Sequence, residues 1–248
     1  MLTDLLKTIA LPPGRVIRAD EGNGEPAFWL SDGPVDANTW RGLYDDPRLW
    51  PLVLIGDRPW VTGEVWHDSI TAPDTHNAGK LLAGWWRDRA AIDPEEDELE
   101  PVTDPFGEDW PGLAPATPAR NDPGESAGKL AERLLQTGRL GLVAAERGAD
   151  ALATMGWAGP VNYENDTGKI AAVLRSWEDR FGARVVGLED HSLLHMSVAN
   201  PPQDDEQALR IAAEHFALCP DNVWQGTESL RAYADELKNA HEWAFWWD

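Results

Sequence analysis

The chain has almost none of the features that cross-link a protein or carry it into a membrane. Its 248 residues include one cysteine, Cys219, which excludes an internal disulfide framework and favours a reducing compartment. No run approaches eighteen consecutive apolar residues, so a membrane-spanning helix is excluded. Residues 1–7 lack a basic stretch followed by a long apolar one, so no secretory signal is expected. These absences predict a cytoplasmic protein.

Basic side chains are also scarce. Lysine and arginine total 21 against 43 aspartates and glutamates, which gives a formal net charge of −22. Nucleic acids and anionic membranes bind positive charge, so neither is an expected partner. The charge instead suits a basic protein partner, because opposite charges speed association and align the two surfaces.

Phenylalanine and tyrosine are few, 5 and 3 residues, beside 14 tryptophans. Packing in the core is the expected role of most of these tryptophans. The alternative for some is a recognition surface, because tryptophan anchors interfaces and ligand pockets.

One acidic, proline-rich stretch divides the chain. Residues 93–125 contain 11 acidic residues, one arginine and 7 prolines, a composition that disfavours helix and central strand. We predict a small mixed α+β unit over 1–92, a connector over 93–125 and an α+β domain over 126–248. The connector contains Phe106 and Trp110, so we expect it to pack in part on a folded neighbour. A disordered acidic linker is the alternative.

Hydrophobic periodicity after residue 139 predicts the order strand, helix, strand, strand, helix, strand. The first of these helices is the clearest, because Ile170, Val173, Trp177 and Phe181 share one face and Gly182 ends it. This is the order of a ferredoxin-like β-α-β-β-α-β domain, in which one layer of helices covers an antiparallel sheet. Two small extra helices are also expected. In the first unit, strands are expected over 27–30, 51–55 and 61–66.

The C-terminal half contains several distinctive short motifs, namely Met155-Gly156-Trp157, Asn162, the run from Val173 to Gly182, Cys219-Pro220-Asp221 and the end from Trp243 to Asp248. Together these motifs resemble a bacterial family known as domain of unknown function 4253. Two segments, 58–60 and 110–115, also resemble those of long actinobacterial members. The resemblance implies a cytoplasmic α+β domain, and it implies no activity, substrate or cofactor.

His215 and Cys219 are the best catalytic candidates. They lie at i and i+4 on one predicted helix face, with Asp221 close behind, an arrangement in which an imidazole activates a thiolate. The position argues against this chemistry, because the C-terminal end of a helix disfavours a thiolate. A buried structural cysteine is the alternative, with Pro220 ending the helix and Asp221 capping the next element.

The tryptophan-rich end of the chain is a second candidate site. If residues 242–247 form a strand, Trp246 faces away from its neighbours Phe245 and Trp247. This predicts either a seam between the two halves or a pocket for a cationic or polar ligand. The residues expected to line the pocket are Asn162, Asp221, Trp246, Trp247 and Asp248.

No metal or cofactor is expected. His191 and His195 form one weak group and His67 and His76 another, but neither has the spacing of a zinc site and no cysteine pair supports one. The chain has no glycine-rich phosphate loop and no G-x-G-x-x-G motif after a strand. It also lacks a G-x-S-x-G elbow, which disfavours an α/β-hydrolase.

The sequence is compatible with three functions. The first is a protein-binding module that neutralises or regulates a basic partner, a physical profile shared by immunity proteins against nuclease-type toxins. The alternative is a small-molecule hydrolase or transferase that uses Asp221, His215 and Cys219 in a cleft near the C-terminal tryptophans. A scaffold or sensor role is a third possibility.

Overall fold

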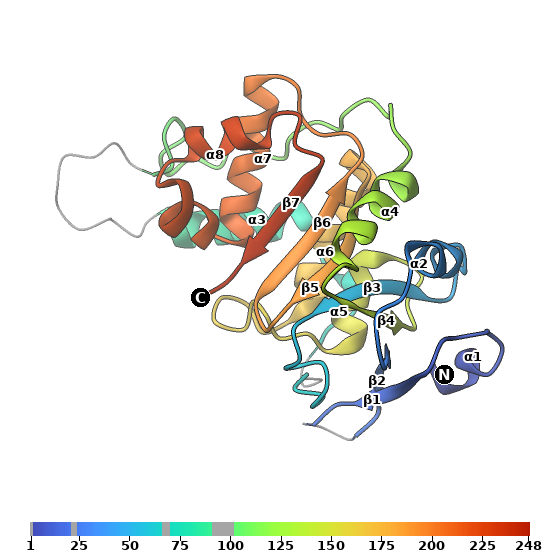
Figure 1. Cartoon of the computed structure of the whole chain (residues 1–248). Helices are drawn as coiled ribbons and strands as arrows, with labels where there is room; N and C mark the ends of the chain where they lie inside the picture. Colours follow the sequence, from blue (N-terminus) through green and yellow to red (C-terminus); the bar gives the residue numbers. More distant parts are fainter. Residues whose placement is uncertain (1, 21–23, 66–69, 91–101) are drawn as a thin grey trace.

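The computed structural model describes residues 2–20, 24–65, 70–90 and 102–248. One sheet runs through the molecule, with the strand order β1-β2-β4-β3-β5-β6-β7 (Figure 1). Neighbouring strands are antiparallel except β3 and β5, which are parallel. The strands are β1 (Gly14–Arg18), β2 (Pro26–Ser31), β3 (Trp50–Ile55), β4 (Arg139–Val143), β5 (Ala183–Glu189), β6 (Leu193–Val198) and β7 (Glu242–Trp246).

Helices cover both faces of the sheet. One face packs against α2 (Ala37–Tyr44) and α4 (Pro123–Leu134). The other packs against α3 (Ala78–Ala90), α5 (Gly148–Met155), α6 (Thr167–Phe181) and α7 (Asp205–Leu218), with α8 (Leu230–Leu237) beside α7. The shorter elements are α1 (Leu2–Leu6), the 3₁₀ turn η1 (Pro73–Thr75) and the π-helical turn η2 (Asn222–Thr227). No helix in the described ranges combines the length and apolarity needed to cross a membrane.

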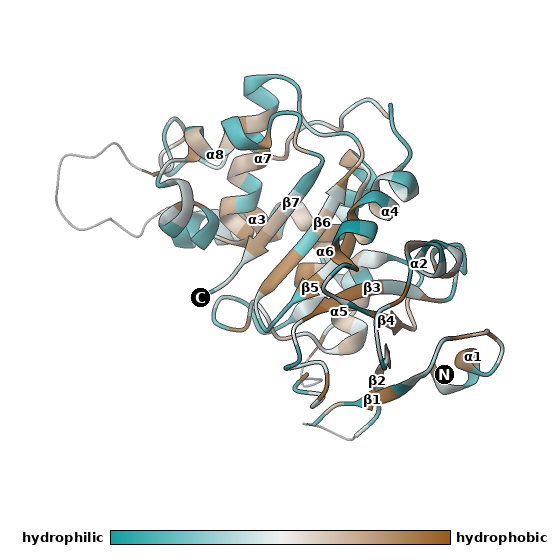
Figure 2. Ribbon diagram, in the orientation of Figure 1, coloured by the Kyte–Doolittle hydropathy of each residue, from teal (hydrophilic) through white to brown (hydrophobic). Residues whose placement is uncertain are grey.

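Strand β3 shows why the sheet has two apolar faces. Leu52 and Leu54 belong to the larger core, on the side of α6 and α7, whereas Val53 between them belongs to the core under α2 and α4. Successive side chains of a strand point to opposite faces, so a fully apolar run needs cover on both. Figure 2 shows the hydrophobic colour concentrated along the central strands.

The chain folds as a mixed α and β structure, but the predicted ferredoxin-like arrangement is not confirmed. The order β4-α6-β5-β6-α7-β7 along the chain agrees with the prediction. In space, however, β3 lies between β4 and β5, and helices cover both faces rather than one. Periodicity identifies the segments that form strands, whereas the neighbour of each strand depends on packing between distant segments.

Strands from both sides of the predicted connector share this sheet. Strand β4 lies between β2 and β3, and the backbone N–H of Leu140 on β4 donates to Ser31 Oγ on β2 (3.1 Å). The connector's predicted end at residue 125 overlaps α4, which begins at Pro123. The cap of α4 is Asp122, whose side chain accepts from the N–H of Glu125 (2.7 Å), and proline suits the first helical position.

The strand predicted over 61–66 is wrong in its described part, because residues 59–63 form turns. Trp60 is fully buried and Val61 is exposed. The alternating apolar residues that predicted a strand therefore belong to a turn, which is held to the core by the Trp60 side chain. Gly63 has a φ of +77°, and a Cβ there would lie 2.1 Å from the carbonyl oxygen of Arg18. Glycine therefore suits this turn, which passes close to β1. Strand β1 itself was not predicted.

Core packing is the main role of the described tryptophans. Four are half-buried, at positions 85, 110, 224 and 246, and none is exposed. The buried ones are Trp29, Trp40, Trp50, Trp60, Trp86, Trp157, Trp177, Trp243 and Trp247.

A fragment of residues 126–248 should fail to fold cooperatively. It would lack β2 and β3, the two neighbours of β4, and so would leave β4 without a hydrogen-bonded partner strand. We expect thermal unfolding of the fragment, followed by circular dichroism, to show no sigmoidal transition, while the full chain shows one. A cooperative transition in the fragment would contradict the shared sheet.

Candidate functional site

The predicted catalytic pair lies inside the core. His215 near the end of α7 and Cys219 just after it are each fully buried. The Cys219 thiol donates to the carbonyl oxygen of Trp246 (2.9 Å) and lies 3.4 Å from Asn222 Oδ1. The imidazole has a different partner, because His215 Nδ1 lies 3.1 Å from the hydroxyl of Tyr233.

Aromatic rings enclose His215. The ring centroids of Trp177, Trp243 and Phe245 lie 4.8, 4.5 and 4.7 Å from that of the imidazole. Its Nε2 is buried and has no hydrogen-bond partner within the described ranges. Burial holds the pKa of His215 well below its usual range, so the imidazole is neutral in the folded protein.

This arrangement provides no thiolate nucleophile. Burial raises the pKa of the Cys219 thiol far above its ordinary value, so the thiol stays protonated. The two groups instead connect secondary-structure elements, since Cys219 bonds to β7 and His215 packs against rings of α6 and β7. This geometry is that of a buried structural cysteine, the alternative to a catalytic role for Cys219.

Three of the predicted ligand-binding residues do come together. Asp221 is almost fully buried, and its carboxylate accepts from the Tyr163 hydroxyl (2.7 Å) and from the backbone N–H of Asp248 (3.0 Å). Gln225 Nε2 donates to the same carboxylate (3.2 Å). Asn162 completes the group, because its Nδ2 donates to the carbonyl oxygen of Asp248 (3.1 Å).

The two tryptophans of this prediction face opposite ways. Trp247 is buried, with its ring 5.6 Å from Trp157 and its Nε1 donating to the carbonyl of Leu218 (3.4 Å). Trp246 is half-buried on the other side of β7, and its backbone N–H donates to Asn222 Oδ1 (3.3 Å). Trp247 is therefore a core residue, and Trp246 has the more accessible ring.

Arg89 joins this group although the sequence did not single it out. Its guanidinium lies over the rings of Trp85 (5.8 Å) and Tyr163 (5.5 Å). The residue is 7% exposed, and its Nη1 has no hydrogen-bond partner in the part of the chain that is described. Burial lowers the pKa of Arg89 to about 10, while the negative charges of Asp88 and Asp221 oppose this shift. Within the described ranges, this buried cation is held by aromatic rings and forms no salt bridge.

One signal for this group was present in the sequence. Arg89 follows Trp85 by four residues, so the two share one face of α3. The π-helical turn η2 begins directly after Asp221, and such turns occur often at functional sites. Neither its position nor the Asp221–Tyr163 contact follows from local patterning.

The histidines considered as metal ligands lie apart. His195 pairs with Glu189 (3.2 Å), His191 lies 3.6 Å from Glu64, and His76 Nε2 lies 2.5 Å from the Thr71 hydroxyl. His67 lies outside the described residues. Within the described ranges, no group of three or more His, Cys, Asp or Glu side chains is arranged to hold a metal ion.

We expect Cys219 to resist thiol reagents in the native protein. Its thiol is buried and protonated, so reaction with dithionitrobenzoate at about pH 8 should be far slower than for an exposed cysteine. Unfolding in guanidinium should release one reactive thiol per chain, which is the internal control. Fast stoichiometric labelling of the native protein would contradict the buried position.

We also expect His215 to make the native state sensitive to acid. Its pKa is lowered in the folded state, so its stabilising contribution is present above the unfolded pKa of about 6.5 and is lost as the pH falls below it. In His215→Gln, urea unfolding at a series of pH values should show a smaller loss of stability below that pH. The matched control is His191→Gln, since His191 is exposed. An unchanged pH dependence in His215→Gln would count against a neutral buried imidazole.

Comparison with known proteins agrees with the motifs of the C-terminal half. Neither the curated proteins nor the solved structures contain a match to the chain. A family match covers residues 139–248, less than half of the chain, and includes Cys219, Asp221 and the C-terminal strand. The likeness of segments 58–60 and 110–115 to long actinobacterial members stays a prediction. Residues 139–248, which supply β4 to β7, match the family described as Domain of unknown function (DUF4253).

Proposed function

We propose that the protein binds a basic protein partner through an acidic face rich in aromatic residues. The observation that carries the proposal is the excess of exposed negative charge. Among the described residues, 25 acidic side chains are exposed against 12 basic ones. Such a surface attracts a positively charged partner over distances of about 10 Å at moderate ionic strength.

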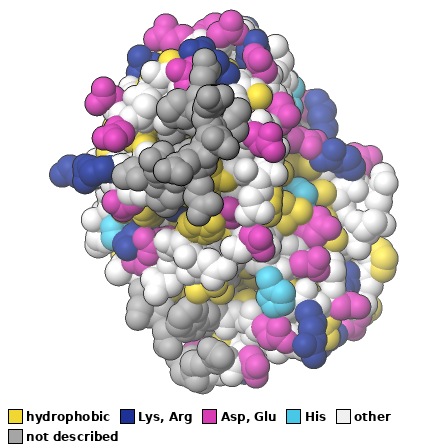
Figure 3. All heavy atoms as spheres, turned by 90° about the vertical axis from the view of Figure 1, so that its left-hand side faces the viewer, with side chains coloured by type: hydrophobic (Ala, Val, Ile, Leu, Met, Phe, Trp, Pro, Cys, Tyr) yellow, Lys and Arg dark blue, Asp and Glu magenta, His cyan; other side chains and the backbone are white. Residues whose placement is uncertain are grey.

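The acidic face is formed by Glu108, Asp109 and Glu228, together with the nearby rings of Trp110 and Trp224. The three carboxylates are exposed, and no described residue forms an ion pair with them. Figure 3 looks at this side of the molecule, and Asp and Glu side chains are spread over it. The preceding stretch, 93–100, adds six acidic residues in the sequence.

Packing joins the two segments that carry these acids. Trp86 of α3 contacts the rings of Trp110 (5.8 Å) and Phe216 (5.7 Å), and Phe216 contacts Trp224 (5.4 Å). Arg231 of α8 pairs with Asp104 (2.7 Å). Trp110 and Trp224 are half-buried, so part of each side chain is accessible at the surface. Aromatic anchors with a charged rim are typical of protein interfaces.

The alternative, a small-molecule hydrolase or transferase, has less support. It needs Asp221, His215 and Cys219 to reach a substrate, and all three are buried. Asp221 already accepts from Tyr163 and from the backbone of Asp248. We therefore favour recognition of a partner by contact, as in an immunity or regulator protein.

The partner should be captured from host lysate in a salt-sensitive way. We expect a tagged protein to recover a basic protein in stoichiometric amount at about 50 mM salt and to lose it at about 500 mM, where charges are screened. The triple variant Glu108→Gln/Asp109→Asn/Glu228→Gln should slow association about tenfold, measured with the purified partner.

The matched control carries Asp20→Asn, Asp45→Asn and Glu146→Gln, three exposed acids elsewhere in the described chain for which no ion pair is found. It makes the same change in net charge and should bind like the wild type. Equal loss in both triple variants would mean that net charge alone attracts the partner. Recovery of no stoichiometric basic protein would overturn the proposal.

A further inference from the structure

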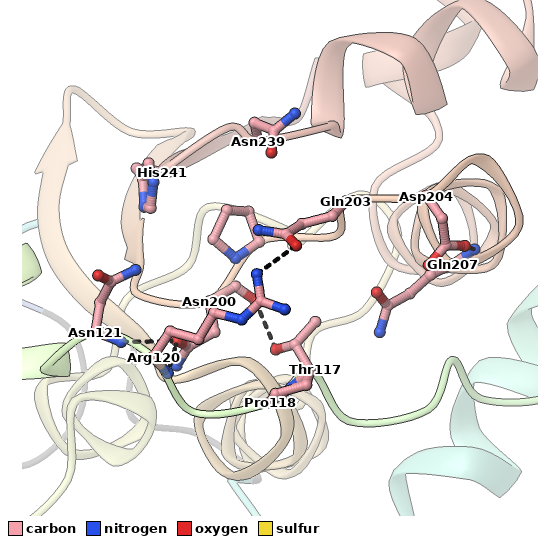
Figure 4. Close-up of a pocket in the computed structure, with 11 residues that line it drawn as sticks. Thr117, Pro118, Arg120, Asn121, Asn200, Gln203, Asp204, Gln207, Asn239 and His241 are labelled. Atoms are coloured by element: carbon pink, nitrogen blue, oxygen red, sulfur yellow. Dashed lines mark hydrogen bonds between the residues drawn. The ribbon is translucent and has the colours of Figure 1, made fainter.

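A polar groove lies apart from the acidic face, where three distant segments meet. A cavity of about 260 Å³ opens between residues 117–121, 200–207 and 239–241, and Figure 4 shows Thr117 and Arg120 across from Asn239 and His241. A second cavity of about 460 Å³ adjoins it and shares Arg120, Asn121 and His241. Together they form one groove centred on Arg120.

The wall of this groove is fixed by hydrogen bonds. Asn200 is 8% exposed, and its Oδ1 accepts from the backbone N–H groups of Arg120 (2.7 Å) and Asn121 (3.1 Å). Asn121 Nδ2 donates to the carbonyl of Ala199 (2.8 Å), and the Thr117 hydroxyl donates to that of Asn200 (2.6 Å). A wall fixed in this way loses little conformational freedom when a ligand binds.

Arg120 is an exposed cation that lines both cavities. Its Nη1 donates to Gln203 Oε1 (2.5 Å), and no carboxylate pairs with it within the described ranges. A guanidinium has five N–H donors in a planar fork that matches a carboxylate. The bond to Gln203 orients this fork and leaves most of its donors free.

The other free groups match a peptide unit. His241 Nδ1 donates to the carbonyl of Val198 (2.9 Å), so in the neutral ring the lone pair lies on Nε2, where it can accept an N–H. The Asn239 side chain is exposed and lines the cavity. Side-chain amides both donate and accept, as a peptide group does.

The lining also excludes other ligand classes. No aromatic ring except the His241 imidazole lines either cavity, so a nucleobase has no platform for stacking. Asp204 lines the same cavity as Arg120, and Asp122 and Glu125 line the adjoining one, where Lys129 is paired with Glu125 (2.9 Å). A doubly charged phosphate is therefore disfavoured, whereas one carboxylate is matched by Arg120.

We propose that this groove binds a carboxylate adjacent to an amide, as in an N-acylated amino acid or the C-terminal residue of a peptide. Arg120 pairs with the carboxylate, while Asn239, Gln203 and His241 Nε2 bind the amide. The site is independent of the acidic face and goes beyond the proposed function. A carboxylate adjacent to an amide occurs both in free metabolites and at protein C-termini. Comparing short and long ligands distinguishes these two sources.

The probes are N-acetyl derivatives of the standard amino acids, each compared with its C-terminal amide, titrated into isotope-labelled full-length protein by NMR. We expect at least one acid to shift the side-chain signals of Asn121, Gln203 and Asn239 with a Kd on the order of 1 mM or lower. Its amide, which lacks the negative charge, should bind at least about tenfold more weakly. A longer acetylated peptide ending in the same residue binds more tightly if the source is a protein C-terminus, and no better if it is a metabolite.

Arg120→Gln removes the cation and keeps a similar length, so it should weaken binding of the acid about tenfold or more. Arg87→Gln is the matched control, because Arg87 is exposed on α3 and does not line the groove. The one-dimensional spectrum of each variant reports whether it is folded. Equal binding by wild type and Arg120→Gln, shifts confined to other regions, or no shift with any acid would each overturn the proposal.

Discussion

The buried carboxylate of Glu214 is the interaction on which the outer parts of this structure depend. Glu214 lies on α7 with no exposed surface. It accepts from the Trp177 indole (2.8 Å), from two nitrogens of Arg180 (2.7 and 2.5 Å) and from the backbone N–H of Ala114 (2.7 Å). Removing a carboxylate from water costs several kcal/mol, and this cost is offset only when its oxygens are fully bonded.

Because Ala114 supplies one of these bonds, the described part of the Pro-rich stretch, residues 102–125, is part of the folded protein. Nearby bonds repeat the pattern, since Arg180 donates to the carbonyl of Ala114 (2.9 Å) and Arg210 to that of Pro111 (2.6 Å). A segment without its own secondary structure needs such partners for its backbone groups. The segment carries Glu108 and Asp109 before this anchor and Arg120 after it. Along the chain, the bond from Ala114 to Glu214 therefore lies between the acidic residues Glu108 and Asp109 and the polar groove at Arg120.

The sequence predicted local structure correctly where the deciding residues lie close together along the chain. The helical face from Ile170 to Phe181 and the Gly182 cap are observed, and Gly182 has the positive φ expected of a helix end. The two consecutive strands predicted after this helix are observed as β5 and β6, which pair antiparallel. These features depend on neighbours within a few residues, which is the range that periodicity covers.

Features that depend on distant residues could not be read in the same way. The insertion of β4 between β2 and β3 joins segments about a hundred residues apart. Glu214 and Arg89 are charged residues on helices, and nothing in their local pattern shows that they are buried. The polar groove combines three separate segments, so its residues had no common motif. For the C-terminal group, the sequence located Asn162, Asp221 and Asp248 and missed Tyr163 and Arg89.

Cys219 and Asp221, which belong to the motifs of the family resemblance, have a structural role. They bind the last strand at the edge of the sheet. Strand β7 has β6 on one side only, and its outer backbone groups bond to the turn after α7. Asn222 Nδ2 donates to the carbonyl of Ala244 (2.7 Å), Cys219 donates to that of Trp246, and Asp221 accepts from the N–H of Asp248. An uncovered edge strand invites pairing with other chains, and this turn closes it. The Cys-Pro-Asp step thus helps to close this edge of the sheet against pairing with other chains.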